Sequence, residues 1–380
     1  MKEVFFQKSR PNIGFQRNLI NSGEWCRMSS LLWWGRSDRD YSRNRIVLTL
    51  LSEMGFQIQY FHPRSSYTGF MEAHFHDFEK PDVIWVPCFR QKDILSASRW
   101  AKKWNIPLIV DPLISAYEKE VFERNKWSPE SRKAEKRRLW EADLFSLADV
   151  VVADTPAHAE FFSETLGVNP RMLSVLYVSA ETDFFKSASS ERNPASGRHE
   201  ILFYGSFLQL QGVDTIVQAA GIFPDMNVRW VLLGDGELKP AMEKAARRHK
   251  NIAFEPWIPY ASLPSRIAQA DILLGIFGST KKAELVIPNK MFQAMAAGKP
   301  VITRYSKAYP PDMFASDVIG WVPCGDPASL AEKVREWIRE PEKLAQRGEK
   351  TRELFDRFFS KEKMKEMLSN ILSKASGENF

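Results

Sequence analysis

The residues with the clearest chemical potential lie close together in the second half of the chain. Lys281 and Lys282 follow a short apolar run, and Pro288, Asn289 and Lys290 come shortly after them. Pro and Asn in sequence are typical of a helix start, where unpaired backbone N–H groups and the positive end of the helix dipole attract anions. The pattern therefore predicts a phosphate site. The alternative without a binding role is that these lysines are solvated loop residues of an ordinary α/β domain.

The segments around these residues have the lengths of a strand–loop–helix–strand unit. Residues 271–276 form an apolar run of strand length, and a polar loop with the two lysines follows. Apolar residues then recur at helical spacing from 289 until Gly298, and residues 300–303 form the next strand. The helix is therefore expected to begin at the carboxyl edge of a parallel sheet, where doubly wound folds bind their ligands.

A second unit of the same kind precedes the first. A strand over 201–204 runs into Gly205 and Ser206, and a helix is expected beyond Gly212, after Gln211. A further strand, 228–233, ends at the tight turn that Gly234 opens. A strand followed by a glycine loop and a helix start is weak evidence for phosphate binding by itself, and the neighbouring unit strengthens it.

Composition limits the classes of protein to consider. With 380 residues, 44% of them hydrophobic, the chain is long enough for two cores, and the net charge of +6 is compatible with anionic partners. No zinc-finger spacing or Arg-rich tail accompanies the charge, so nucleic acid is not an expected partner. The three cysteines are odd in number and far apart, which suits a reducing cytoplasm. Neither a signal peptide nor an apolar run of membrane-spanning length is recognisable.

The first half of the chain also alternates between strand and helix patterns. The loop 35–43 between the first strand and the first helix contains Arg36, Asp38, Tyr41 and Arg43. Its D-x-D pattern could hold a metal ion, but three arginines crowd it, which favours a charge-balanced loop that contacts anions. Asp111 follows a strand at 106–110, either at the ligand-binding edge of the sheet or as a helix N-cap.

Two segments resemble a known enzyme family. GIFGSTKKAELVIPNKMFQAMAAGKPVI is similar to the donor-binding motif of family-4-type glycosyltransferases with the GT-B fold. GRSDRDYSRNR resembles the amino-terminal loop of a subgroup of these enzymes. The resemblance implies two Rossmann-like doubly wound α/β domains that face each other across a cleft. Residues 1–186 would bind the acceptor, 198–354 would bind a nucleotide sugar after a linker at 187–197, and a helix over 355–372 within 355–380 would cross back to the first domain.

The resemblance also assigns roles to residues. It gives Asp111, Lys282 and Lys290 to catalysis, and Arg36, Asp38, Tyr41 and Arg43 to a loop that contacts acceptor or phosphate. The expected donor-binding residues are Gly205, Ser206, Gln211, Gly234, Trp257, Ile258, Pro288, Asn289, Lys290 and Gln293. Three of these depart from the family pattern: Gln293 stands where Glu is usual, and Ser206 and Gln211 lie in a loop that commonly carries Arg and Lys.

The function implied by the resemblance is transfer of a sugar from a nucleotide sugar to a saccharide or lipid-linked acceptor, with retention of configuration and without a metal or other cofactor. It would serve the synthesis of surface glycans or glycoconjugates, in the cytoplasm or at the inner face of the membrane. The basic residues in a helix over 129–147 are taken first as a solvated face and second as a membrane-surface patch. Two alternatives remain: a catalytically weak nucleotide-sugar-binding protein, and a nucleotide-sugar epimerase on the same fold.

Overall fold

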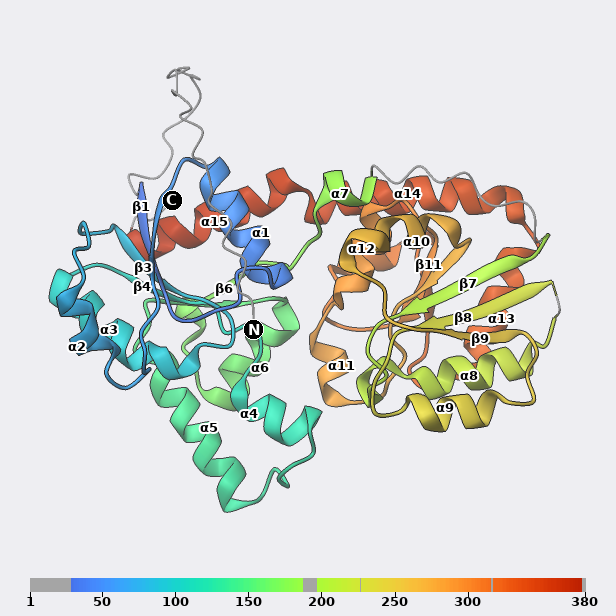
Figure 1. Ribbon diagram of the computed structural model, residues 1–380, viewed down its shortest axis with the longest axis horizontal. Helices are drawn as coiled ribbons and strands as arrows, with labels where there is room; N and C mark the ends of the chain where they lie inside the picture. Colours follow the sequence, from blue (N-terminus) through green and yellow to red (C-terminus); the bar gives the residue numbers. More distant parts are fainter. Residues whose placement is uncertain (1–28, 187–196, 226, 316, 378–380) are drawn as a thin grey trace, which may run out of the picture.

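The computed structural model describes residues 29–186, 197–225, 227–315 and 317–377. Within these residues the chain forms two six-stranded sheets, each with helices packed against it (Figure 1). All strand pairs are parallel. Most central strands are continuous runs of Val, Ile, Leu and aromatic residues, because a parallel strand is buried on both faces. The predicted two-domain α/β fold is confirmed.

The sheet of the first domain has the order β2-β1-β3-β4-β5-β6. Its strands are β1 Ser30–Trp34, β2 Gln57–Phe61, β3 Val83–Val86, β4 Leu108–Val110, β5 Val150–Ala153 and β6 Leu173–Val175. Its helices are α1 Ser42–Glu53, α2 Gly69–Glu72, α3 Ile94–Trp104, α4 Ala116–Glu118, α5 Arg132–Phe145, α6 Pro156–Leu166 and α7 Thr182–Lys186, and a π-helical turn, η3 Lys119–Glu123, extends α4. The chain reverses direction across the sheet between β1 and β3, so the loops after these strands flank a crevice.

The sheet of the second domain has the order β12-β11-β10-β7-β8-β9. Its strands are β7 His199–Tyr204, β8 Val228–Leu233, β9 Ile252–Glu255, β10 Ile272–Leu274, β11 Val301–Arg304 and β12 Gly320–Val322. Its helices are α8 Val213–Ile222, α9 Lys239–Ala246, α10 Leu263–Gln269, α11 Lys281–Leu285, α12 Asn289–Ala296, α13 Pro327–Ile338 and α14 Pro341–Phe359. Here the reversal lies between β7 and β10, which are the strands of the two predicted phosphate-binding units.

Helix starts follow the capping chemistry of the sequence. The Thr155 hydroxyl accepts a hydrogen bond from the His158 N–H, and Pro156 occupies the first position of α6. Asp326 accepts from the Ser329 N–H in the same way before α13. In both cases a capping residue followed directly by Pro marks the helix start in the sequence.

The chain returns to the first domain at its end, but the returning helix begins later than predicted. Helix α14 packs against α12 and α13, whereas α15, Lys361–Ser376, packs on α1 and β5 of the first domain. The Ser360 backbone is extended, with ψ of 161°, and its hydroxyl caps α15. The single helix predicted over 355–372 is therefore wrong, and the predicted boundary at residue 355 falls inside α14.

The aromatic cluster near the end of α14 joins the two domains. Phe359 is completely buried, and its ring lies 4.9 Å from Phe292 of the second domain and 5.0 Å from Tyr177 of the first. The Ser179 hydroxyl donates to the Phe359 carbonyl at 2.6 Å. The crossing point is therefore a packed part of the core rather than an exposed linker.

Two further expectations differ from the structure, and one cannot be compared. Lys281 and Lys282 lie in helix α11, which Thr280 caps, and not in a polar loop. Strand β10 stops at Leu274, before the predicted end at 276. The predicted linker at 187–197 lies outside the described residues except for Gly197.

Candidate active site

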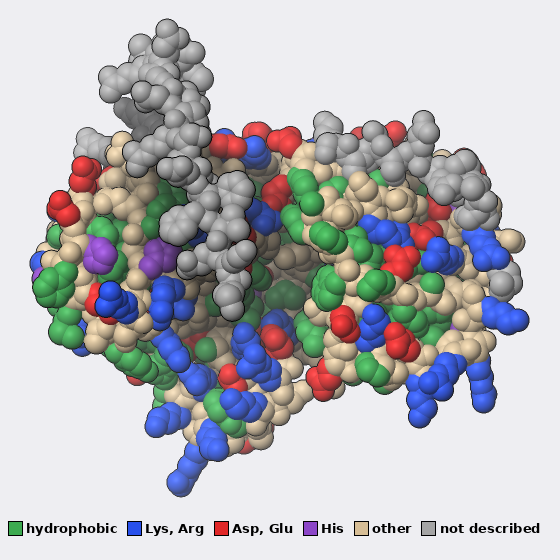
Figure 2. All heavy atoms as spheres, viewed as in Figure 1, with side chains coloured by type: hydrophobic (Ala, Val, Ile, Leu, Met, Phe, Trp, Pro, Cys, Tyr) green, Lys and Arg blue, Asp and Glu red, His purple; other side chains and the backbone are tan. Residues whose placement is uncertain are grey.

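A cleft lies between the two domains and is lined by both. Its volume is about 560 Å³, and Figure 2 shows a hollow between the two halves of the molecule. One wall comes from the loop after β7 and the start of α12, at the point where the second sheet reverses its strand order. The predicted site residues that line the cleft are Tyr41, Gly205, Ser206, Gln211, Trp257, Lys282, Pro288, Asn289, Lys290 and Gln293. Those that do not line it are Arg36, Asp38, Arg43, Asp111, Gly234 and Ile258.

Glycines allow the loops of this wall to approach one another closely. Gly234 has φ of +135°, and a Cβ there would lie 2.0 Å from the Gly205 carbonyl oxygen. Gly205 has φ of +146°, and a Cβ there would lie 3.0 Å from Nζ of Lys290. Gly234 therefore supports the wall from behind rather than contacting a ligand, and Gly205 keeps the space beside the lysine open.

Lys290 lies in the first turn of α12 and points toward the loop after β7. Its Nζ donates to Oε1 of Gln211 at 2.6 Å and lies 3.6 Å from the centre of the Phe203 ring. The side chain is only 6% exposed, and no carboxylate pairs with it among the described residues. Burial lowers the pKa of Lys290 well below its usual value. A lysine without a counter-ion at a cleft wall is a binding group for an anion.

The start of α12 offers further donors to the same place. Pro288 occupies the N-cap position and no side chain caps the helix. Gln293, one turn further, accepts a hydrogen bond from the Tyr204 hydroxyl at 3.1 Å through Oε1. Both Pro288 and Gln293 line the cleft, so the start of this helix and the Gln293 amide border the same space.

Two side chains of the second domain reach across to the first. Lys282 is mostly buried and forms an ion pair with Glu123 at the end of η3. The Asn289 amide donates to the Ser42 hydroxyl at 3.0 Å. The predicted phosphate ligand Lys282 therefore lies in the cleft, but in this structure a carboxylate of the opposite domain neutralises it.

The structure corrects the expectations for Arg43 and Asp111. Their side chains form a two-bond ion pair, at 2.8 and 3.2 Å, and both are almost completely buried. Arg43 also donates to the carbonyl oxygens of Leu176 and Tyr177 at 2.6 and 2.9 Å. Because every donor of Arg43 points into the domain, it is not available to a diphosphate. Asp111 is equally enclosed, so it neither faces a sugar hydroxyl nor caps a helix.

The remaining residues of the first loop divide in the same way. Tyr41 lines the cleft and contacts Phe89 edge-on at 5.0 Å. Arg36 and Asp38 are exposed outside the cleft, and Oδ1 of Asp38 accepts from the Asp40 N–H. Within the described part of the chain, no three His, Cys, Asp or Glu side chains are placed to hold a metal ion.

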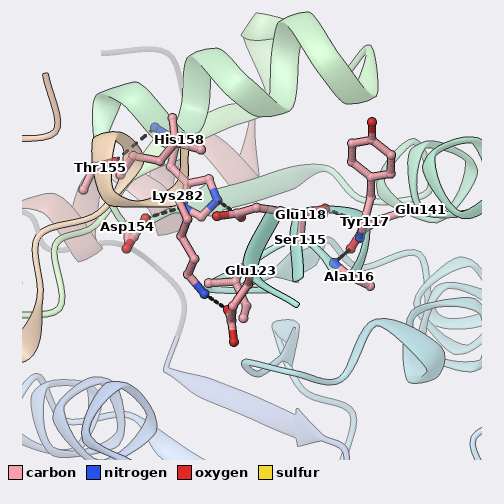
Figure 3. A network of polar contacts seen from close by, with 12 residues as sticks. Ser115, Ala116, Tyr117, Glu118, Glu123, Glu141, Asp154, Thr155, His158 and Lys282 are labelled. Carbon is pink, nitrogen blue, oxygen red and sulfur yellow. Dashed lines mark hydrogen bonds and ion pairs between the residues drawn. The ribbon is translucent and has the colours of Figure 1, made fainter. Parts of the chain in front are cut away.

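The sequence reasoning missed a buried network on the first-domain side of the cleft (Figure 3). His158 is completely buried, with Nδ1 2.6 Å from Oδ1 of Asp154 and Nε2 2.8 Å from Oε2 of Glu118. Burial alone would lower the pKa of His158, but the two carboxylates outweigh it and raise the pKa to about 10. The ring is therefore an imidazolium near neutral pH. The Asp–His spacing of four on a helix start was the available signal in the sequence.

These features define the class of protein. Two doubly wound domains face each other across a cleft, and the reversal point of the second sheet presents to that cleft a helix start and a lysine that has no carboxylate partner in the described part of the chain. This is the architecture of an enzyme that binds a nucleotide-linked substrate between its domains.

Comparison with known protein families places the chain within this class. Residues 198–340 match the family described as glycosyl transferases group 1, and residues 39–178 match the glycosyl transferase 4-like domain. Together the two matches cover most of the chain. The protein therefore belongs to the family-4-type glycosyltransferases with the GT-B fold.

Curated relatives match over part of their length. A probable glycosyltransferase of Pseudomonas aeruginosa, WbjE, is 27% identical over 149 residues, which span 37% of this chain and 36% of that protein. A putative colanic acid biosynthesis glycosyl transferase of Escherichia coli K12, WcaI, is 28% identical over 166 residues, 43% of this chain and 40% of its own.

Solved structures resemble the fold over nearly the whole chain. The Anabaena protein HepE in complex with UDP has a TM-score of 0.68 at 15% identity, and the match covers 91% of this chain and all of that one. Sucrose-phosphate synthase from Thermosynechococcus elongatus has a TM-score of 0.72 at 15% identity and covers 93% of this chain and 100% of its own. At these identities the likeness establishes the fold alone.

Proposed function

We propose that the protein transfers a sugar from a nucleotide-sugar donor to a hydroxyl group of a saccharide or lipid-linked acceptor. The observation that carries this proposal is Lys290, a buried lysine that has no carboxylate partner among the described residues and lies at the helix start facing the interdomain cleft. A diphosphate supplies the negative charge that this arrangement lacks.

The donor is proposed to lie along the wall of the second domain. Its diphosphate would accept hydrogen bonds from Lys290 and the first N–H groups of α12, and its ribose would contact Gln293. Trp257, more than half exposed at the cleft, offers a surface for the nucleobase. UDP is the first nucleotide to test, because HepE was solved with UDP and with UDP-glucose.

The chemistry requires stabilisation of the charge that develops on the departing diphosphate. Lys290 and the α12 start would provide it, and Lys282 would add to it once Glu123 releases it. We propose that this set acts without a metal ion and that the configuration of the sugar is retained, as in the family that the sequence resembles. Closure of the domains would exclude water from the transferred sugar.

The acceptor is proposed to enter from the first-domain side. A second cavity of about 560 Å³ adjoins the cleft through Glu123 and Leu210 and is lined by both domains. The name of the E. coli relative refers to colanic acid biosynthesis, and this supports a proposed role in surface glycan synthesis.

Contact with a membrane surface is part of the same proposal. Tyr67 in the turn before α2, Met71 in α2 and Phe75 in the 3-10 turn after it are 80, 59 and 90% exposed. One short segment of the first domain therefore exposes three large apolar side chains. Among the described helices none is long and apolar enough to cross a bilayer.

A thermal-shift screen of UDP, GDP, ADP and their sugars tests donor binding. A ligand at a hundred times its Kd should stabilise the protein by about 2.7 kcal/mol. Lys290→Ala should abolish the shift, whereas Lys250→Ala, an exposed lysine at the opposite edge of the second sheet, should keep it. An unchanged shift in Lys290→Ala would place the phosphate elsewhere.

A second candidate function is nucleotide-sugar binding without transfer. Gln293 is neutral where the family pattern has a carboxylate, and Lys282 already forms an ion pair with Glu123. Turnover separates the two functions. If the purified protein binds a nucleoside diphosphate but neither transfers nor hydrolyses any donor of the panel, the binding function is the correct one.

A further inference from the structure

Asp154 is a nearly buried carboxylate that has one oxygen without a partner at the cleft. The residue follows β5, is 4% exposed and lines the cleft. Its Oδ1 is 2.6 Å from Nδ1 of His158, whereas Oδ2 has no hydrogen-bond or ion-pair partner among the described residues. In Figure 3 the second oxygen points away from the imidazole. Because Asp154 lines the cleft and the imidazole holds only Oδ1, Oδ2 is the oxygen that a hydrogen-bond donor of a ligand in the cleft can reach.

The other side of His158 is fixed as firmly. Nε2 lies 2.8 Å from Glu118, whose backbone N–H donates to the Ser115 hydroxyl at 3.1 Å. Glu118 and His158 are both buried, and their pair keeps the ring charged. A charged ring held at both nitrogens cannot rotate, so it fixes the direction in which Asp154 presents its free oxygen.

The groups around Asp154 indicate which kind of ligand its Oδ2 can bind. Tyr41 lines the cleft near Asp154, and burial together with Cys88 and this carboxylate raises the pKa of Tyr41 to about 12, so its hydroxyl stays neutral. Burial and Asp154 also raise the pKa of Tyr177 to about 12. A carboxylate beside neutral hydroxyls repels phosphate and accepts hydrogen bonds from a neutral polyhydroxyl ligand. Of the three lysines that line the cleft, Lys290 and Lys282 come from the opposite domain, where the diphosphate is proposed to lie, and Lys119 comes from the same domain as Asp154.

We propose that Asp154 is a saccharide-binding residue whose Oδ2 accepts a hydrogen bond from a sugar hydroxyl in the cleft, with His158 and Glu118 as its positioning residues. This inference rests on the proposed function and adds a residue to it on the first-domain wall. The hydroxyl can belong to the sugar of the donor or to a saccharide acceptor, and the experiment distinguishes these two sources.

The test compares Asp154→Asn with wild type and with Asp77→Asn, a control at an exposed position of the same domain. Calorimetry gives the affinities for UDP and UDP-glucose, or for the corresponding pair selected by the screen, and saturation-transfer NMR gives binding of glucose to the UDP-bound protein. Asp154→Asn should leave the UDP affinity unchanged, since UDP lies on the other wall. Loss of a charge-assisted hydrogen bond should weaken saccharide binding about ten-fold or more.

The results assign the source of the hydroxyl. A loss of UDP-glucose affinity alone identifies the donor sugar, and a loss of glucose binding alone identifies the acceptor. Unchanged affinities for both, or an equal loss for UDP itself, would overturn the inference. A wild-type protein that binds no nucleotide of the screen would instead overturn the proposed function.

If Asp154→Asn does not fold, the variant Glu118→Gln and a crystal structure of the wild type with saccharide test the role of Asp154. Glu118→Gln should weaken the binding of the same saccharide as Asp154→Asn does, either UDP-glucose or glucose, but by a smaller factor. Its affinity for UDP should equal that of the wild type. A parallel fall in every affinity would show that the network is only structural. In a crystal structure of the wild type with UDP and glucose or with UDP-glucose, a sugar hydroxyl should lie within about 3.2 Å of the Asp154 carboxylate. Saccharides far from it in both complexes would contradict the assignment.

Discussion

At the scale of single residues, the electrostatic state of Lys290 links ligand binding to pH. Burial lowers its pKa well below the usual value in the free protein, because the ammonium has lost its water and no carboxylate of the described chain replaces it. A bound diphosphate would favour the charged form and raise that pKa. UDP should therefore bind most tightly below the pKa of the free protein and more weakly as pH rises above it.

The corresponding measurement is calorimetry in two buffers with different ionisation enthalpies. Between the two pKa values of Lys290, binding should take up close to one proton, and this uptake should disappear in Lys290→Ala. Lys250→Ala should show the same uptake as wild type. Proton uptake that persists in Lys290→Ala would assign it to another group.

His158 makes the folded protein sensitive to alkaline pH. Its pKa of about 10 in the folded state lies above the value of about 6.5 for an unfolded chain. The stabilisation is complete below about pH 6.5 and is lost as pH rises through the folded pKa, by about 1.4 kcal/mol per pH unit in between. Urea unfolding of wild type and His158→Gln across this range should show this difference in slope, and parallel curves would contradict it.

The sequence could indicate some of these residues and not others. Lys290 and Gln293 belong to one local motif, so a helix start places them together whatever the rest of the chain does. Asp111 and Arg43 are 68 positions apart, and nothing local shows that they pair. The sequence shows which charges exist, whereas the packing of the sheet decides which of them are neutralised before a ligand arrives.

At the scale of the elements, close packing of two loops sets the shape of the donor wall. Gly234 after β8 holds φ of +135° against the Gly205 carbonyl, and a Cβ would collide with that oxygen. Gly234→Ala should destabilise the protein by more than about 2 kcal/mol, because both the backbone conformation and the contact are lost. It should also weaken UDP binding by displacing the loop after β7.

Gly167 provides a matched control for this substitution. It ends α6 with φ of +68°, and a Cβ there would meet nothing within 4 Å. Gly167→Ala should therefore cost only the left-handed conformation, about 1–2 kcal/mol, and leave UDP affinity unchanged. Chemical denaturation and calorimetry measure both quantities. Equal losses of stability and affinity in the two variants would show that the close approach is unimportant.

Regular elements were the most predictable part of the molecule. Strands buried on both faces are continuous apolar runs, and capping residues such as Thr155 and Asp326 mark helix starts chemically. The break at Ser360 was missed because apolar spacing continues through it, from Phe359 to Met364. The chain breaks at Ser360 because α14 packs on the second domain whereas α15 packs on the first.

At the scale of the whole molecule, one ion pair couples the cleft to the relation between the domains. Lys282 of the second domain pairs with Glu123 of the first, 159 positions away, so the sequence showed the lysine but not its counter-ion. Glu123 also lines both interdomain cavities. A diphosphate that uses Lys282 must displace this carboxylate, and the free energy of breaking the pair is subtracted from the affinity.

Glu123→Gln should therefore bind UDP more tightly than wild type, by about three- to ten-fold, since pairs of this kind contribute about 1 kcal/mol. The gain should shrink at high salt, which weakens the ion pair in the wild type. Glu164→Gln, an exposed position on α6, should match wild type. Calorimetry at two salt concentrations measures these affinities, and in the double variant with Lys282→Ala the gain should vanish. Weaker binding by Glu123→Gln alone would instead show that the pair holds the cleft in its binding-competent shape.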